Sequence, residues 1–188
     1  MCASTCRVPS DQKGATLVEV LITLLVIAIG LLGIAALQVR LQSADIDSYQ
    51  RAHAMVLLED IANRIEANRG QAASYVTGPG SPTGVGVTCA TAAATRVQVD
   101  LTEWCKSLQG ASELVGANKR GAMLGGRGCV EAAGTDTYRI TVAWQGLGPV
   151  AAPPVSVACG ANLYDGAGCT GDRCRRVLTT LVRIADLI

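Results

Sequence analysis

The apolar run at residues 15–37 constrains this chain more than any other feature of its sequence. The run consists almost wholly of aliphatic side chains, has no proline, and contains one ionisable residue, Glu19. As a helix rising about 1.5 Å per residue it would be about 35 Å long, enough to cross a hydrocarbon core of about 30 Å. The chain has no Phe and is only 3% aromatic, so little else could cover a buried helix on all sides. We therefore expect a membrane-spanning helix.

Glu19 is unusual because a carboxylate at mid-membrane costs about 2.5–3.5 kcal/mol, and less near the edge of the bilayer. In one interpretation it lies in the headgroup zone and reaches toward water. In the other it pairs with a cation on a neighbouring subunit. The helix alone favours neither.

Residues 1–14 are polar, contain Pro9, and carry Arg7 and Lys13, so they are typical of a leader peptide. The positive charges ahead of the helix favour a cytoplasmic N-terminus. No A-x-A cleavage site follows the apolar run directly, which argues against an ordinary secretory signal. We expect the two cysteines of the leader, Cys2 and Cys6, to be free thiols and not ligands of a metal ion.

The sequence from Lys13 and Gly14 through Glu19 resembles the N-terminal signal of type IV prepilins and type II secretion pseudopilins. The resemblance implies that prepilin peptidase cleaves after Gly14, that Ala15 becomes the methylated N-terminus, and that Glu19 pairs with the terminal amine of an adjacent pilin. The chain departs from the family in one respect, because Ala15 stands where a large apolar residue is usual.

The apolar pattern continues beyond residue 37 at spacings of three and four, which predicts one helix over residues 16–68 with Gly70 as its stop. We expect three parts: the leader at residues 1–14, a membrane and assembly half of the helix at residues 15–37, and a periplasmic helix with its head at residues 38–188. After subtraction of the first two parts, roughly 150 residues remain, which suits one domain.

Within the head, Gly, Pro, Ser and Thr predict a loop over residues 70–95. A short helix is expected over residues 101–109, with Asp100 as N-cap, Glu103 as its capping-box partner and Trp104 in the core. A Gly-rich bend then leads into a strand at Cys129. Alternation predicts a half-buried strand over residues 138–145, with Tyr138, Ile140, Val142 and Trp144 on its apolar face, and a further strand near the C-terminus. The expected fold is α+β and pilin-like, a long N-terminal helix packed on an antiparallel sheet.

The head also resembles that of the PilV class of type IV pilus minor pilins. The residues that carry this resemblance are Asp100, Leu101, Trp104 and Leu108, then Gly125, Gly126, Gly128 and Val130, and finally Tyr138, Ile140, Val142 and Trp144. The resemblance implies a low-abundance subunit that helps to initiate pilus assembly, sits at or near the tip, and supports motility and adhesion.

Six cysteines lie beyond the leader, and an even number in an exported domain favours disulfides. Fifteen pairings are possible, and the sequence does not choose among them. A zinc site is the weaker alternative, because C-x-x-C spacing and histidine partners are missing. Residues 165–172 resemble a calcium loop only faintly and favour a disulfide-bounded turn. The six are Cys89, Cys105, Cys129, Cys159, Cys169 and Cys174.

Other function classes find little support. A net charge of +1 shows no electrostatic footprint for nucleic acid, and no catalytic constellation surrounds the single histidine. We expect no enzyme activity, no cofactor, no metal and no small-molecule substrate. The expected partners are prepilin peptidase, the major and other minor pilins, and the bacterial inner membrane. The alternatives are a type II secretion pseudopilin and a single-pass membrane protein with a periplasmic binding head.

Overall fold

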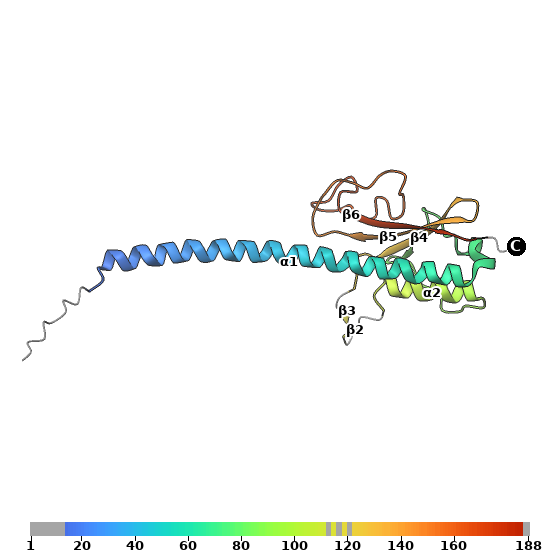
Figure 1. The fold of residues 1–188 in the computed structure, drawn as a ribbon, viewed down its shortest axis with the longest axis horizontal. Helices are drawn as coiled ribbons and strands as arrows, with labels where there is room; N and C mark the ends of the chain where they lie inside the picture. The colour runs from blue at the N-terminus through green and yellow to red at the C-terminus, as the bar shows by residue number, and fades with distance from the viewer. Residues whose placement is uncertain (1–13, 112–113, 116–117, 120–121, 186–188) are drawn as a thin grey trace, which may run out of the picture. The chain divides into compact units, whose positions relative to one another are not determined.

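The computed structural model describes residues 14–111, 114–115, 118–119 and 122–185. The chain divides into two compact units, Met1–Ser43 and Ala44–Ile188. The elements, drawn in Figure 1, are α1 (Leu17–Ala67), the 3₁₀ helix η1 (Arg69–Tyr75), β1 (Thr83–Gly84), α2 (Arg96–Leu108), β2 (Leu114–Val115), β3 (Asn118–Lys119), β4 (Arg127–Gly134), β5 (Thr137–Gln145) and β6 (Arg175–Arg183).

Helix α1 spans 51 residues without a break, which confirms the single helix predicted over residues 16–68. The buried residues of α1 all lie in its second half. They recur at helical spacing along one face, and the apolar ones join the core of the head, whereas the first half of the helix is exposed throughout. The buried residues are Gln50, Ala54, Leu57, Leu58, Ile61 and Ile65.

The prediction that Gly70 stops the helix and begins a loop is wrong. Helix α1 ends at Ala67, and the chain continues at once into η1, where Gly70 is the second residue. Asn68 leaves the helical conformation with φ −116° and ψ 43°, so the direction changes before the glycine is reached. The tighter turn buries Ala72 and Tyr75, three residues apart, on one face. The burial of these two side chains in the core outweighs the loop-like composition of the segment.

Helix α2 also differs from its prediction, because it begins at Arg96 and not at Leu101. Thr95 is the N-cap, and it forms a complete capping box with Gln98. Asp100 lies inside the helix and is fully buried. The predicted cap at Asp100 and its partner Glu103 are therefore wrong, although Trp104 occupies the core as expected.

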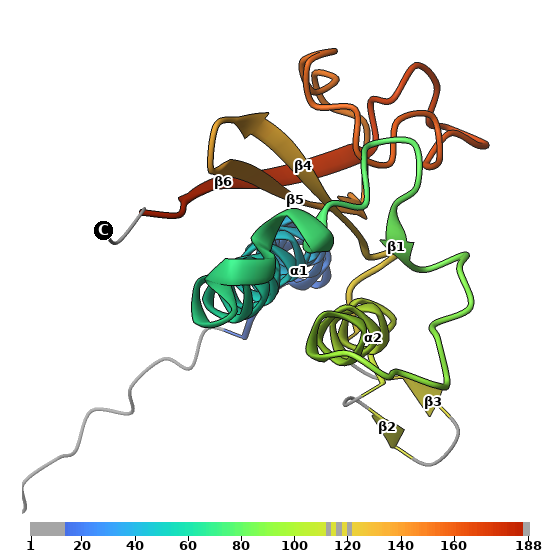
Figure 2. The ribbon, with the colours of Figure 1, turned by 90° about the vertical axis from the view of Figure 1, so that its right-hand side faces the viewer.

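Four strands form one antiparallel sheet in the order β1–β4–β5–β6, which confirms the predicted α+β, pilin-like architecture. Strand β5 lies in the middle, with Thr141 opposite Cys129 on β4 and Thr179 on β6. Figure 2 shows α1 and α2 on the same side of this sheet. A separate two-residue pair joins β2 to β3.

The helices and the sheet enclose one hydrophobic core. The face of β5 that was predicted to be buried carries Tyr138, Ile140, Val142 and Trp144, and all four are buried. Trp104 of α2 packs directly on Gly128 of β4. A Cβ atom added to Gly128 would lie only 2.6 Å from the ring carbon Cζ2 of Trp104. Gly128 is thus required by the close approach of the tryptophan.

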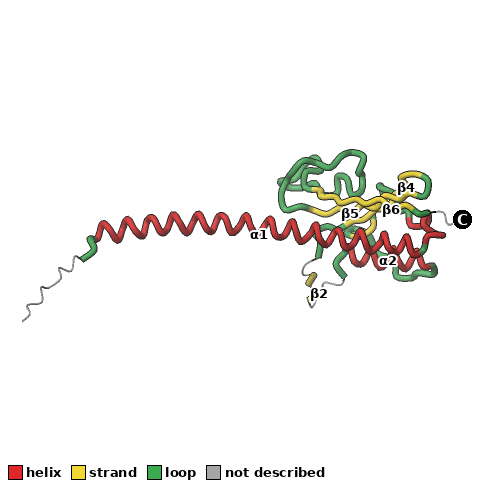
Figure 3. The backbone as a smooth tube through the Cα atoms, in the orientation of Figure 1, coloured by secondary structure: helices red, strands yellow, loops and turns green. Residues whose placement is uncertain are grey.

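The opposite face of β5 was expected to be open, because the strand was predicted to be half-buried. The structure corrects this expectation at Thr141 and Ala143, which are both fully buried. The segment between β5 and β6, drawn as a loop in Figure 3, covers them. Gly160 approaches the Cβ atom of Ala143, and Cys159 Sγ lies 3.9 Å from the Thr141 carbonyl oxygen. The sheet is therefore covered on both faces at its centre.

Candidate processing and assembly site

The residues predicted to be processed lie just ahead of α1. Gly14, Ala15 and Thr16 have no regular secondary structure and are exposed, and no other group lies within 4 Å of where a Gly14 side chain would start. Such an open, non-helical segment suits a substrate that must enter a peptidase. The residues before Gly14 lie outside the described part of the chain, so the Cys2 and Cys6 prediction stays a prediction.

Thr16 and Glu19 begin the helix together. The Glu19 backbone N–H donates to the Thr16 hydroxyl at 3.3 Å and to its carbonyl oxygen at 3.0 Å, so Thr16 acts as an N-cap. This places Glu19 in the first turn of α1, where the partial positive charge of the helix N-terminus favours a carboxylate. Glu19 is exposed, and no ion pair of its side chain occurs among the described residues. Sequence reasoning missed the capping role of Thr16, although the Thr-x-x-Glu spacing signals it.

The first half of α1 presents an apolar surface all round. Every described residue as far as Ile46 is exposed, including Leu17 at 81% and Leu32 at 71%. By length and composition, α1 is the one helix in the described part of the chain that could cross a membrane. Apolar surface of this extent has to be covered by lipid or by other helices. This half of α1 therefore suits a membrane anchor and a helix-packing surface.

All six cysteines of the head form disulfides, in pairs that the sequence could not specify. Cys89 joins Cys105, Cys129 joins Cys159, and Cys169 joins Cys174. The first links the segment before α2 to that helix. The second ties β4 to the segment that covers the sheet.

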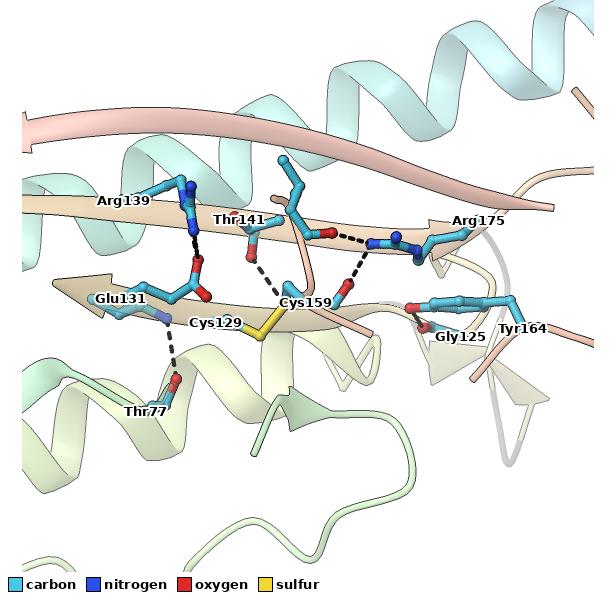
Figure 4. The surroundings of a disulfide bond; sticks show 11 residues. Thr77, Gly125, Cys129, Glu131, Arg139, Thr141, Cys159, Tyr164 and Arg175 are labelled. Atoms are coloured by element: carbon cyan, nitrogen blue, oxygen red, sulfur yellow. Dashed lines mark hydrogen bonds and ion pairs between the residues drawn. A yellow bond between two sulfur atoms is a disulfide. The ribbon is translucent and has the colours of Figure 1, made fainter. Parts of the chain in front are cut away.

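The Cys129–Cys159 disulfide lies at the centre of this covered face (Figure 4), and both of its cysteines are fully buried. Arg175, which is 2% exposed, donates to the carbonyl oxygens of Val157 at 2.6 Å and Cys159 at 3.0 Å. Asp172 balances its charge, with two contacts of 2.9 Å. The buried arginine and the disulfide therefore hold the same short segment against β5.

Residues 165–172, with their faint calcium-loop pattern, form a turn closed by Cys169–Cys174. The Asp165 carboxylate accepts the backbone N–H groups of Gly171 at 3.2 Å and Asp172 at 2.9 Å. Its oxygens are thus occupied by the turn itself. Among the described residues, no group of three or more His, Cys, Asp or Glu could hold a metal ion.

Residues 9–35 match the family model described as the prokaryotic N-terminal methylation motif. The chain carries a type IV prepilin-type signal. This type of signal belongs to type IV prepilins and pseudopilins and implies processing by prepilin peptidase, and the match covers only the beginning of the chain. No curated protein and no solved structure matches the chain.

The prepilin signal spans Gly14, Thr16 and Glu19, so the geometry at the start of α1 is the geometry of this motif. The apolar helix that follows fits a single-pass anchor in the inner membrane. The structure brings Thr16 and Glu19 together and leaves Gly14 and Ala15 open on the N-terminal side.

A buried ionic cluster in the head escaped sequence reasoning altogether. Asp100 accepts from Arg64 at 3.0 Å, from Arg96 at 3.0 Å and from the Tyr75 hydroxyl at 2.5 Å. Burial raises the pKa of Tyr75 above its ordinary value, and the hydrogen bond to Asp100 adds a smaller effect in the same direction. Burial alone would lower the pKa of Arg64, but hydrogen bonds to Glu103, Asp60 and Asp100 raise it beyond its usual range. This cluster joins α1, η1 and α2. The sequence shows only that acidic and basic residues occur on two helices, which does not say that they meet.

Proposed function

We propose that this protein is a minor pilin of the PilV class that takes part in type IV pilus assembly. The observation that carries the proposal is the methylation motif at residues 9–35, which ends inside an exposed apolar helix. The α+β head with its disulfides supports the same proposal. A role in initiating the pilus, a place at its tip, and a contribution to motility and adhesion come from the resemblance of the head alone.

In the proposed sequence of events, the precursor inserts with residues 15–37 across the inner membrane and residues 38–188 in the periplasm. Prepilin peptidase hydrolyses the peptide bond between Gly14 and Ala15, which leaves a free amine on Ala15. Methylation of that amine follows. The Glu19 carboxylate of one subunit then pairs with the positively charged amine of a neighbour, because neither charge is tolerated alone in an apolar bundle.

An intact-mass measurement of the protein recovered from cell envelopes tests the processing. We expect loss of residues 1–14 and a gain of one methyl group on Ala15. Retention of the original Met1 would contradict the proposal and favour a membrane protein with a periplasmic binding head.

Glu19→Ala tests the assembly role, and Thr16→Ala is its matched control. Both changes remove a group that stabilises the first turn of α1, but only the first removes the carboxylate. We expect Glu19→Ala to be cleaved and yet absent from sheared pili, whereas Thr16→Ala is cleaved and incorporated. Equal loss of both variants from pili would show that Glu19 acts only on the helix.

A deletion strain distinguishes the two systems that share this signal. Loss of surface pili with normal protein secretion supports a pilus subunit. Loss of secretion with normal pili would assign the chain to a type II secretion pseudopilus.

A further inference from the structure

The loop that follows β5 leaves apolar side chains exposed to solvent. Residues 147–157 have the sequence LGPVAAPPVSV, with no charged residue and with Ser156 as the only polar side chain. Leu147 is 47% exposed, Val150 is 45% exposed and Val155 is 96% exposed. We call residues 147–157 the apolar loop. A surface loop whose side chains are nearly all apolar marks a site that contacts protein or lipid.

The apolar loop has a fixed shape on the head. The Val150 backbone N–H donates to the Arg173 carbonyl oxygen at 2.9 Å. The Val157 N–H closes a turn on the Pro154 carbonyl oxygen at 2.9 Å, with Val155 at the tip of this turn. Because the tip is already held in place, little conformational entropy is lost when Val155 is buried in a contact.

Figure 1 shows the apolar loop at the end of the head where α1 enters it. Arg176 donates to the Gly148 carbonyl oxygen at 2.8 Å and lines a cavity together with Asp47 of α1. The head begins at Ala44, and the predicted membrane span ends at residue 37. The stretch of α1 between them is helical and rises about 10 Å. The tether that joins this end of the head to the predicted span is therefore short.

Exposed arginines flank the apolar loop. Arg173 and Arg51 are exposed, and neither forms an ion pair among the described residues. Asp172, next to Arg173 in the chain, is paired with Arg175, and Asp47 is the one carboxylate that lines the cavity with Arg51. These groups together carry an excess of positive charge. Positive charge beside an apolar tip suits a surface with phosphate groups above hydrocarbon, which is the surface of a phospholipid bilayer.

The shape of the tip favours lipid over a folded partner. At 96% exposure, Val155 touches almost nothing of its own head, so it stands on a convex point. A stable protein interface buries about 800 Å² on each partner, which a single projecting turn does not offer. A bilayer deforms around such a tip. The tether through α1 makes the contact intramolecular in effect, so that a few buried side chains are enough to hold it.

We propose that the apolar loop inserts into the periplasmic leaflet of the phospholipid bilayer that anchors α1, with Arg51 and Arg173 at the level of the lipid phosphates. The contact holds the head against the membrane surface while the subunit remains in the bilayer. The inference rests on the membrane anchor and the periplasmic head of the proposed function. It is independent of the pairing of Glu19 and of the class of pilin.

The contact is tested on the full-length protein in nanodiscs of phosphatidylethanolamine and phosphatidylglycerol. A lipid with a nitroxide near the headgroup end of its acyl chain broadens the nuclear magnetic resonance signals of nearby groups. We expect strong broadening of the methyl signals of Val155 and Val150. The methyl signals of Leu181, which is 65% exposed on β6 and outside the loop, should stay sharp. No broadening at Val155, or equal broadening at Leu181, overturns the proposal.

Val155→Ser removes the apolar tip, and Leu181→Ser is the matched control. Val155→Ser should lower the ratio of docked to undocked heads about tenfold, the loss expected when one valine side chain stays in water. The readout is the broadening at Val150, which Leu181→Ser should leave unchanged. Unchanged broadening at Val150 in Val155→Ser overturns the insertion of the tip.

Arg173→Gln tests the role of charge, because it keeps the backbone contact with Val150. It should reduce docking about fivefold in these nanodiscs, the effect of one arginine near an anionic surface. It should have no effect where phosphatidylcholine replaces phosphatidylglycerol. An equal effect in both lipids overturns the pairing of Arg173 with lipid phosphates.

The occupant is tested in cells by photo-cross-linking from benzoylphenylalanine in place of Val155. We expect an adduct whose added mass is that of a phospholipid. An adduct with a protein, including a neighbouring subunit, or no adduct at all overturns lipid as the occupant. Failure of the proposed function is seen separately, as retention of the leader in the intact mass.

Discussion

The carboxylate of Asp100 lies 3.0 Å from the guanidinium of Arg64, which stands 36 positions earlier in the chain. The Asp100 side chain is 1% exposed and that of Arg64 is 21% exposed. This pair joins the two helices on one side of the sheet, and Tyr75 adds η1 to the same cluster. Because the pair is largely out of water, loss of one partner costs more than loss of a surface ion pair.

Asp100→Asn should lower the free energy of unfolding by about 3 kcal/mol, the lower end of the range for breaking a buried pair. The change keeps the size of the side chain but leaves Arg64 and Arg96 without their shared carboxylate. Urea unfolding of the purified protein measures the loss. Glu103→Gln removes a 53% exposed partner of the same arginine and should cost less than about 1 kcal/mol. Equal effects of the two variants would refute the special role of Asp100.

Alkaline pH should destabilise the head through its buried tyrosines. Burial raises the pKa of Tyr75 and of Tyr164, so the folded state holds both phenolic protons more tightly than the unfolded state. Above about pH 10 the unfolded chain loses these protons first, and the free energy of unfolding falls as the pH rises further. Urea unfolding between pH 8 and pH 11 measures this slope. Tyr164→Phe should make it shallower, whereas Tyr49→Phe, at an exposed position, should leave it unchanged.

The three disulfides should contribute to stability in the order of the length of chain that each one closes. Their sequence separations are 30 for Cys129–Cys159, 16 for Cys89–Cys105 and 5 for Cys169–Cys174. The chain-entropy relation predicts losses of about 3.7, 3.1 and 2.2 kcal/mol when each pair is replaced by alanine. Denaturant unfolding of the three double variants gives the order. A larger loss for Cys169–Cys174 than for Cys129–Cys159 would contradict it.

Gly128→Ala should destabilise the protein by about 1–3 kcal/mol, the usual cost of overpacking a core. The added methyl group would lie 2.6 Å from Trp104 Cζ2 and 2.9 Å from Leu108 Cδ1, and both of these side chains are fully buried in the core. Thermal unfolding followed by circular dichroism measures the change. Gly70→Ala is the control, because no group lies within 4 Å of its added Cβ, and it should be neutral or slightly stabilising. An unchanged Tm for Gly128→Ala would show that the contact with Trp104 can relax.

The errors of sequence reasoning in the head occurred where two local patterns competed. Thr95 with Gln98 and Asp100 with Glu103 both have the spacing of a capping box. The structure uses the first, because Asp100 is needed inside the helix as the partner of Arg64, Arg96 and Tyr75. In the same way, the loop-like composition after Gly70 yielded to the burial of Ala72 and Tyr75.

The sequence by itself determined the long helix, the prepilin signal at its start and the two long C-terminal strands. These features depend on spacings of two, three or four residues, which lie within a single stretch of chain. Only the tertiary structure decided the disulfide pairs, the covering of Thr141 and Ala143, and the pairing of Asp100 with Arg64. Each of these depends on groups far apart in sequence, such as Cys129 and Cys159, that meet only after the strands have taken their register and the core has closed.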